Sequence, residues 1–107
     1  MTNVTEIQLS PEELKLLLYI VELYKERTTD ITEDGLLIFS DDIVQKTGLS
    51  YYQQMSLKKK LEIKGLLKLK FRDIPRKLYY KLPVGLVKEY LEARGFSGYV
   101  DHEVFNT

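Results

Sequence analysis

Apolar and basic residues alternate along two runs of the chain, 66–72 and 77–82. Because successive side chains of a strand point to opposite faces, each run predicts a β-strand. The residues between them include Pro75, which is typical of a turn. The segment therefore predicts a β-hairpin with one apolar and one basic face. The apolar face comprises Leu67, Leu69, Phe71, Leu78, Tyr80 and Leu82, and the outward face comprises Lys68, Lys70, Arg72, Lys77, Tyr79 and Lys81.

A long helix is predicted from Ser10 to about Arg27, where apolar residues recur at helical spacing. Ser10 and Glu13 have the spacing of a capping box at its start. Its apolar positions form two stripes, the first with Leu14, Leu17, Leu18, Val21 and Tyr24 and the second with Leu16, Ile20 and Leu23. A helix that is apolar on nearly all sides must be covered on nearly all sides. We therefore expect the first stripe to pack on the core and the second to contact another copy of the chain in a homodimer.

Further elements are predicted on both sides of the hairpin: a short strand at 36–39, helices at 41–47 and 51–64, and a helix between Pro83 and Gly95. Ser40 and Ser50 are placed to cap the helices that follow them. Gly48 and Gly65 are placed to end those helices, because glycine enters the left-handed conformation at little cost.

Helix, turn, helix and basic hairpin thus follow one another from Asp41 to Leu82. The stretch 61–67 (LEIKGLL) ends the second of these helices with a leucine, a charged pair around an isoleucine, a glycine and two leucines. This order and this motif resemble the winged helix-turn-helix family of DNA-binding domains over roughly residues 36–82. The resemblance implies an α+β fold of about four helices with a small antiparallel sheet whose hairpin forms one wing.

One position departs from the family pattern. About a turn before Leu57, where the family has an aliphatic residue, this chain has Gln53 or Gln54. Met55 or one member of the Tyr51–Tyr52 pair is then a candidate to fill that space, so either tyrosine has an alternative role as core filler.

The charge of the chain is unevenly distributed, although its net value is zero. Residues 50–82 carry ten cations and two anions, a net charge of +8, and the remainder carries six cations and fourteen anions, a net charge of −8. A lysine run such as 58–60 is, by itself, typical of a solvated helix face. Because the basic residues continue through the hairpin, the segment favours binding to a polyanion such as nucleic acid.

The resemblance implies that the N-terminal half of helix 51–64 enters the major groove of double-stranded DNA while the wing lies on the backbone or minor groove. Glutamine can bond an adenine edge, and tyrosine can bond a phosphate or contact a thymine methyl group. We expect Arg76, at the turn, to line the minor groove. A helix-capping serine, Ser40 or Ser50, could add a phosphate contact. The predicted DNA-contacting residues are Ser50, Tyr51, Tyr52, Gln53, Ser56, Lys59 and Lys60 on the helix and Lys68, Lys70, Arg72, Arg76 and Lys77 on the wing.

The sequence gives little support for an enzyme or a metal-binding protein. The chain has no cysteine, and its single histidine, His102, stands beside Asp101 and Glu103, three successive residues that do not converge on one ion. We expect no enzyme activity, no metal and no cofactor. The second hypothesis is a protein-interaction module on a winged-helix scaffold, which leaves the basic face unexplained. Similar domains occur in phage and plasmid replication or partition proteins and in small transcriptional regulators.

The expected organisation is a flexible lead-in at 1–9, one domain at 10–95 and a tail at 96–107. The tail contains apolar residues and could dock on the domain, on a partner subunit or in a groove of another protein; helix 10–27 is a second candidate surface for a protein partner. No run is long and apolar enough for a membrane helix, and the N-terminus lacks the features of a signal peptide. We therefore expect a cytoplasmic protein that is nucleoid-associated when bound to DNA.

Overall fold

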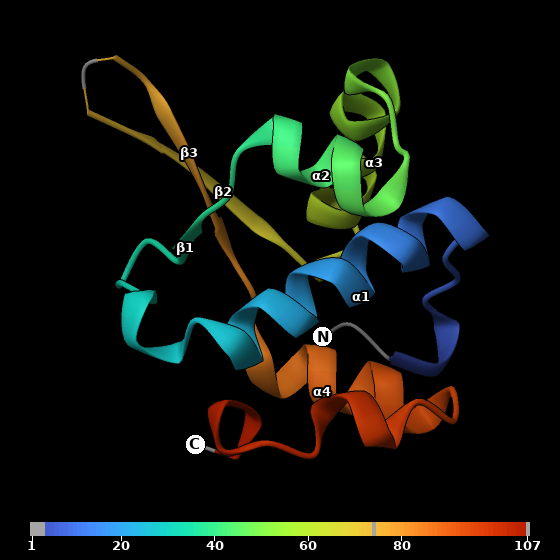
Figure 1. The fold of residues 1–107 in the computed structure, drawn as a ribbon. Helices are drawn as coiled ribbons and strands as arrows, with labels where there is room; N and C mark the ends of the chain where they lie inside the picture. Colours follow the sequence, from blue (N-terminus) through green and yellow to red (C-terminus); the bar gives the residue numbers. More distant parts are fainter. Residues whose placement is uncertain (1–3, 74, 107) are drawn as a thin grey trace.

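The computed structural model describes residues 4–73 and 75–106. This part of the chain forms an α+β fold with four α-helices and one three-stranded antiparallel sheet of order β1-β3-β2, as expected at that level (Figure 1). The helices are α1 (Pro11–Glu26), α2 (Ser40–Thr47), α3 (Tyr51–Ile63) and α4 (Val84–Ala93). The strands are β1 (Leu36–Leu37), β2 (Lys68–Arg72) and β3 (Lys77–Lys81). Short 3-10 turns are η1 (Val4–Glu6), η2 (Thr28–Asp30), η3 (Ser97–Val100) and η4 (Glu103–Phe105).

Helix α1 runs through the middle of the fold and contacts α2, α3 and η3 (Figure 1). Its second apolar stripe is fully buried, with exposed fractions of 0% for Leu16 and Ile20 and 5% for Leu23, whereas Leu14 and Leu18 of the first stripe are half-buried. The prediction that Leu16, Ile20 and Leu23 contact a second copy of the chain is therefore wrong. They belong to one core cluster, and α1 packs against α2, α3 and η3, so other elements of the same chain supply the cover that was assigned to a partner.

The segments before and after residues 10–95 both pack against the domain. Residues 4–9 were expected to be a flexible lead-in, but η1 packs against α4, Ile7 is buried, and the Arg94 guanidinium donates a hydrogen bond to the Ile7 carbonyl. Residues 1–3 lie outside the described part of the chain. At the other end Val100 and Phe105 are buried, so the tail docks on its own domain, one of the three alternatives.

The capping box predicted at the start of α1 is present and is extended by an ion pair. The Glu13 amide donates to the Ser10 hydroxyl, and the Ser10 amide donates to one Glu13 carboxylate oxygen, both at 3.2 Å. The other oxygen accepts from the Lys64 ammonium at 2.7 Å, and Lys64 also donates to the Gln8 carbonyl at 2.7 Å. Burial alone would raise the pKa of Glu13, but the hydrogen bonds from Lys64 and Ser10 outweigh it and lower the pKa. This carboxylate ties the start of α1 to the end of α3.

Tyr24 of α1 fastens the base of the hairpin. Its buried hydroxyl donates to the Tyr80 carbonyl at 3.1 Å and accepts from the Leu82 amide at 2.9 Å. Gly35 lies against the same strand with a φ of +106°, and a Cβ atom there would stand 2.2 Å from the Tyr80 carbonyl oxygen. Only glycine fits that position. These contacts determine where β3 leaves the core.

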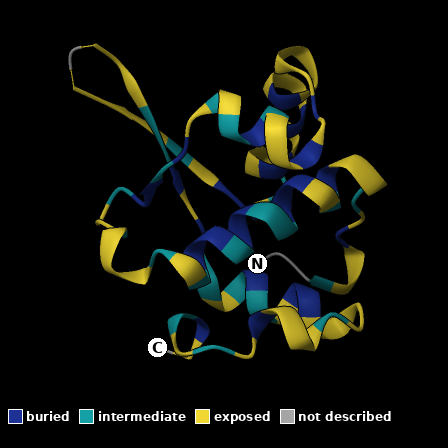
Figure 2. Ribbon diagram, in the orientation of Figure 1, coloured by how far each residue is buried: buried dark blue, intermediate teal, exposed yellow. Residues whose placement is uncertain are grey.

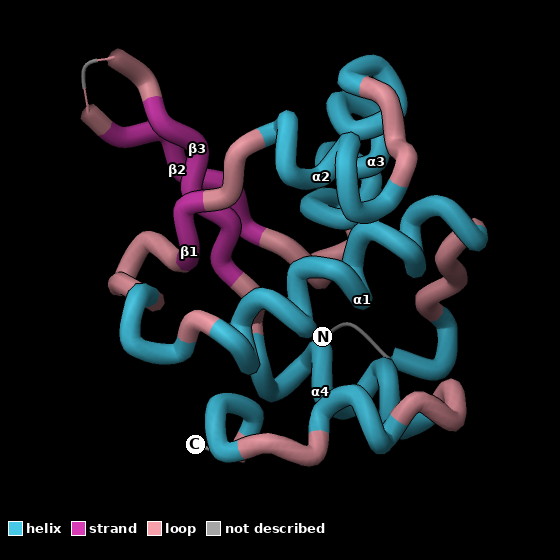
Figure 3. The backbone as a smooth tube through the Cα atoms, viewed as in Figure 1, coloured by secondary structure: helices cyan, strands magenta, loops and turns pink. Residues whose placement is uncertain are grey.

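Beyond this base the hairpin projects away from the helices (Figure 3). On its predicted apolar face Tyr80 is buried, Leu69 and Leu78 are half-buried, and Phe71 is 52% exposed. Figure 2 shows the same gradient, with the distal strands largely exposed. The apolar face is therefore covered only near the core, because the strands extend past the helices.

Candidate nucleic-acid interface

The rotation of α3 is determined by Gln54. Its side chain is 1% exposed and takes the core position beside Leu57, where the family pattern has an aliphatic residue. The Gln54 side-chain amide donates to the Leu49 carbonyl at 3.0 Å and to the Ser40 carbonyl at 3.3 Å, which joins the start of α2 to the turn before α3. Neither Met55 nor Tyr52 fills this space; both side chains are exposed.

The start of α2 corrects a second expectation. Ser40 was predicted to cap this helix, but α2 begins at Ser40 itself, and no side chain caps it. The Phe39 carbonyl already accepts hydrogen bonds from the Asp42 and Ile43 amides, so the helix starts one residue earlier than its serine suggests.

Ser50 caps α3 as predicted, and Gln53 completes the capping box. The Gln53 amide donates to the Ser50 hydroxyl at 3.2 Å, while the Gln53 side-chain carbonyl accepts from the Ser50 amide at 2.8 Å. This geometry holds the Gln53 side chain at the helix terminus. A bidentate contact to adenine needs both the amide oxygen and nitrogen, and the oxygen is already engaged.

Tyr51, the first residue of α3, is directed toward α2. Its hydroxyl donates to the Asp41 carboxylate, and this hydrogen bond raises the pKa of Tyr51. The tyrosine is nevertheless exposed, so it is not core filler. Because the hydroxyl lies beside a carboxylate, Tyr51 is a poor phosphate ligand in this arrangement.

The solvent side of α3 carries Tyr52, Ser56 and Lys59 at helical spacing, with Met55 and Lys60 beside them. All five side chains are exposed. Tyr52 is the most exposed large apolar side chain of the described chain, at 87%. The predicted contacts Tyr52, Ser56, Lys59 and Lys60 are thus available on one side of the helix.

The cations of the basic segment divide into two groups. Lys64 is held by Glu13 and Gln8, and the Lys58 ammonium lies 5.9 Å from the centre of the Tyr80 ring, where burial lowers its pKa. These two lysines make contacts within the fold and are less available to a ligand. The other lysines of the segment are exposed: Lys59, Lys60, Lys68, Lys70, Lys77 and Lys81.

The outward face of the hairpin concentrates positive charge through its register. Lys68 pairs with Lys81, and Arg72 pairs with Lys77, so like charges stand directly opposite each other at two positions. Between these pairs Lys70 stands opposite Tyr79. Like charges in directly opposed positions destabilise a hairpin. The predicted basic face is confirmed, and it carries a cost that a bound polyanion would relieve.

Two acidic residues of the loop before β1, Glu33 and Asp34, lie beside this face. The Asp34 carboxylate, in the loop before β1, accepts two hydrogen bonds from the Arg72 guanidinium, at 2.8 and 3.2 Å. The bond from Arg72 lowers the pKa of Asp34, and the same bond raises the pKa of Arg72. The sequence reasoning missed this partner, although Asp34 stands just before the strand that pairs with β3. Arg72 is therefore partly neutralised.

Arg76 lies in the hairpin turn, and its side chain packs on the apolar face of the hairpin. Its guanidinium carbon is 3.8 Å from the centre of the Phe71 ring, a close cation–π contact. Phe71 was predicted to point into the core; it instead offers an exposed ring that supports Arg76.

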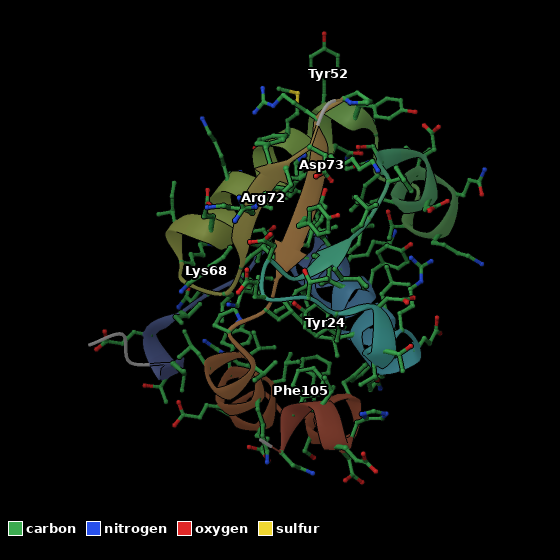
Figure 4. All side chains as sticks on the ribbon, turned by 90° about the vertical axis from the view of Figure 1, so that its left-hand side faces the viewer. Tyr24, Tyr52, Lys68, Arg72, Asp73 and Phe105 are labelled. Carbon is green, nitrogen blue, oxygen red and sulfur yellow. The ribbon has the colours of Figure 1, made fainter. Side chains whose placement is uncertain are left out.

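The start of α3 and the hairpin turn lie at the same end of the molecule, on two sides of it (Figure 1). Figure 4 shows Tyr52 and Asp73, which begins the hairpin turn, at the same end, with Arg72 and Lys68 along the hairpin below them. The exposed α3 side chains and the hairpin tip thus project at the same end of the molecule from separate elements. Within the described residues no cluster of acidic or histidine side chains could hold a metal ion, and His102 accepts a hydrogen bond from the Val104 amide.

No protein-family model, curated protein or solved structure matches this chain. Among the described residues no helix is long and apolar enough to cross a membrane.

Proposed function

We propose that this chain binds duplex DNA as a winged helix-turn-helix domain, with α3 in the major groove and the β2–β3 hairpin as the wing. The order of elements supports the proposal: α1, β1, α2, α3, β2 and β3 follow one another, and β1 joins the sheet beside β3. The turn between α2 and α3 contains Gly48 in the left-handed conformation, with a φ of 75°. Winged helix-turn-helix domains that this chain resembles serve replication, partition or transcriptional regulation, and we propose one of these roles for it.

The observation that carries the proposal is the outward face of the hairpin. Two of its three cross-strand pairs oppose cation to cation, and the Lys70–Tyr79 pair lies between them. Solubility alone needs scattered charge of both signs, whereas the two strands of this face repeat positive charge in register, with Asp34 of the neighbouring loop bonded to Arg72. Phosphates of a nucleic-acid backbone neutralise such a row and release their counterions on binding.

The test is a titration of labelled duplex DNA by fluorescence anisotropy at several salt concentrations. Lys70→Ala on the hairpin and Lys59→Ala on α3 should each weaken binding to every DNA sequence. Each lost phosphate contact should make the negative slope of log K against log salt shallower by about 0.9. Lys15→Ala, which removes an exposed cation from α1, is the matched control and should change neither quantity.

The proposal fails if the protein does not retain duplex DNA at moderate salt, or if Lys70→Ala and Lys59→Ala behave like the control. A protein-interaction module on the same scaffold then becomes the better reading.

A further inference from the structure

The exposed large apolar side chains concentrate in a few elements. Among the described residues, seven large hydrophobic side chains are exposed, and six of them lie on α3, just before α2, or on the hairpin: Phe39, Tyr51, Tyr52, Met55, Ile63 and Phe71. Tyr99, in the tail, is the exception. Single exposed apolar residues are ordinary, but a gathering of them marks a binding surface.

The solvent side of α3 is poorly equipped to read paired bases. Direct readout in the major groove relies on arginine, asparagine and glutamine, whose side chains form bidentate bonds with base edges. On α3 the oxygen of the Gln53 amide is engaged by the capping box, and Gln54 is buried. The side of the helix that carries Ser56 and Lys59 instead presents the ring of Tyr52 and the thioether of Met55.

We infer that this surface takes DNA with locally unpaired bases, whose exposed rings stack on Tyr52 and on the Phe71–Arg76 pair while the flanking lysines hold the phosphates. The inference rests on the proposed DNA-binding function and names the form of DNA. Base–aromatic stacking accepts any base, because every base has a π-face. Tyr52 suits this role because 87% of it is exposed, at the same end of the molecule as the hairpin turn (Figure 4).

The charges beside these rings favour a nucleic-acid strand over a protein as the occupant. Lys59 and Lys60 lie about two turns along α3 from Tyr52. Arg76 lies on the Phe71 ring, while Lys70 and Arg72 stand on the other face of β2. Phe71 is already covered by a guanidinium at 3.8 Å, a stack to which a planar base can be added. Aromatic rings interleaved with cations are the usual composition of a single-strand binding surface.

The experiment compares three labelled probes by anisotropy with the full chain: a paired duplex, the same duplex with a short central mismatched bubble, and one strand alone. We expect the bubble to bind about tenfold more tightly than the paired duplex. Tyr52→Leu keeps an apolar side chain but removes the ring, and it should lose most of this preference, whereas Tyr52→Phe should keep it. Tyr99→Leu, on the other exposed tyrosine outside this surface, is the control. Thermal unfolding of each variant confirms that it is folded.

The outcomes separate the two proposals. If the bubble and the paired duplex bind equally, or if Tyr52→Leu keeps the preference, the inference is overturned while duplex binding stands; the exposed rings would then serve a protein contact. If none of the three probes is retained, the DNA-binding proposal fails as well.

Discussion

A single oxygen atom, the Tyr24 hydroxyl, is expected to contribute a large share of the stability of this fold. The substitution Tyr24→Phe removes it and leaves the ring in place. The hydroxyl bonds two main-chain groups of the third strand and its continuation, the Tyr80 carbonyl at 3.1 Å and the Leu82 amide at 2.9 Å. Both residues are buried, so water does not readily replace the lost partner.

The magnitude follows from these two bonds. Loss of the bond to the Tyr80 carbonyl removes about 1 kcal/mol, and a buried amide left unpaired at Leu82 costs about 1–3 kcal/mol. Tyr24→Phe should therefore lower the free energy of unfolding by about 2–4 kcal/mol, a large part of the roughly 5–15 kcal/mol typical of a domain.

Tyr80→Phe is the matched control, because it makes the same chemical change in a neighbouring buried tyrosine. The Tyr80 hydroxyl is buried and has no hydrogen-bond partner among the described residues. Its removal should leave the free energy of unfolding within about 1 kcal/mol of the original or raise it. Urea unfolding followed by circular dichroism measures both variants under identical conditions. Equal losses in Tyr24→Phe and Tyr80→Phe would refute the assignment of the Tyr24 hydroxyl as the fastening of the hairpin.

Three other predictions concern titration and backbone geometry. Burial raises the pKa of Tyr80 to about 12 and also raises that of Tyr24, so the folded state keeps protons that the unfolded chain releases; stability measured by urea unfolding should fall as the pH rises from about 10 toward 12, and less so in Tyr80→Phe. Glu13→Gln keeps a cap acceptor but loses the charge opposite Lys64, and it should cost about 1–3 kcal/mol at neutral pH. Because the folded-state pKa of Glu13 is lowered, this difference should shrink as the pH falls below about 4 and should vanish in acid; a constant difference would contradict the ion pair. Gly35→Ala should cost at least about 2 kcal/mol in thermal or urea unfolding, since its Cβ would strike the adjacent strand; an unchanged midpoint would contradict the register of β1.

The features that the sequence predicted well depend on neighbouring residues. The capping box at Ser10 and the cap at Ser50 involve partners three residues away, and both are present, although the return bond from Gln53 was not predicted. The alternation of β2 and β3 likewise predicts which side chains share a face, and the register confirms it. Such signals are readable because the physical contact and the sequence spacing coincide.

The features that were missed depend on distant parts of the chain. Leu16, Ile20 and Leu23 look like a partner interface until α2, α3 and the C-terminal segment are packed around α1 in one core. Periodicity alone cannot say which element covers a stripe. Gln54 was ambiguous for a similar reason, because its burial depends on acceptor carbonyls at Ser40 and Leu49 that no helix pattern reveals.

The two ends of the hairpin are held by different numbers of contacts. At Tyr80 and Leu82 its main chain is bonded to α1, whereas from Lys70 to Lys77 the strands have mainly each other. Amide hydrogen exchange should therefore be slow at the base and fast toward the turn. In the proposed complex, a hairpin that is rigid at its base and flexible at its tip would follow a groove whose width changes along the DNA, without loosening the core.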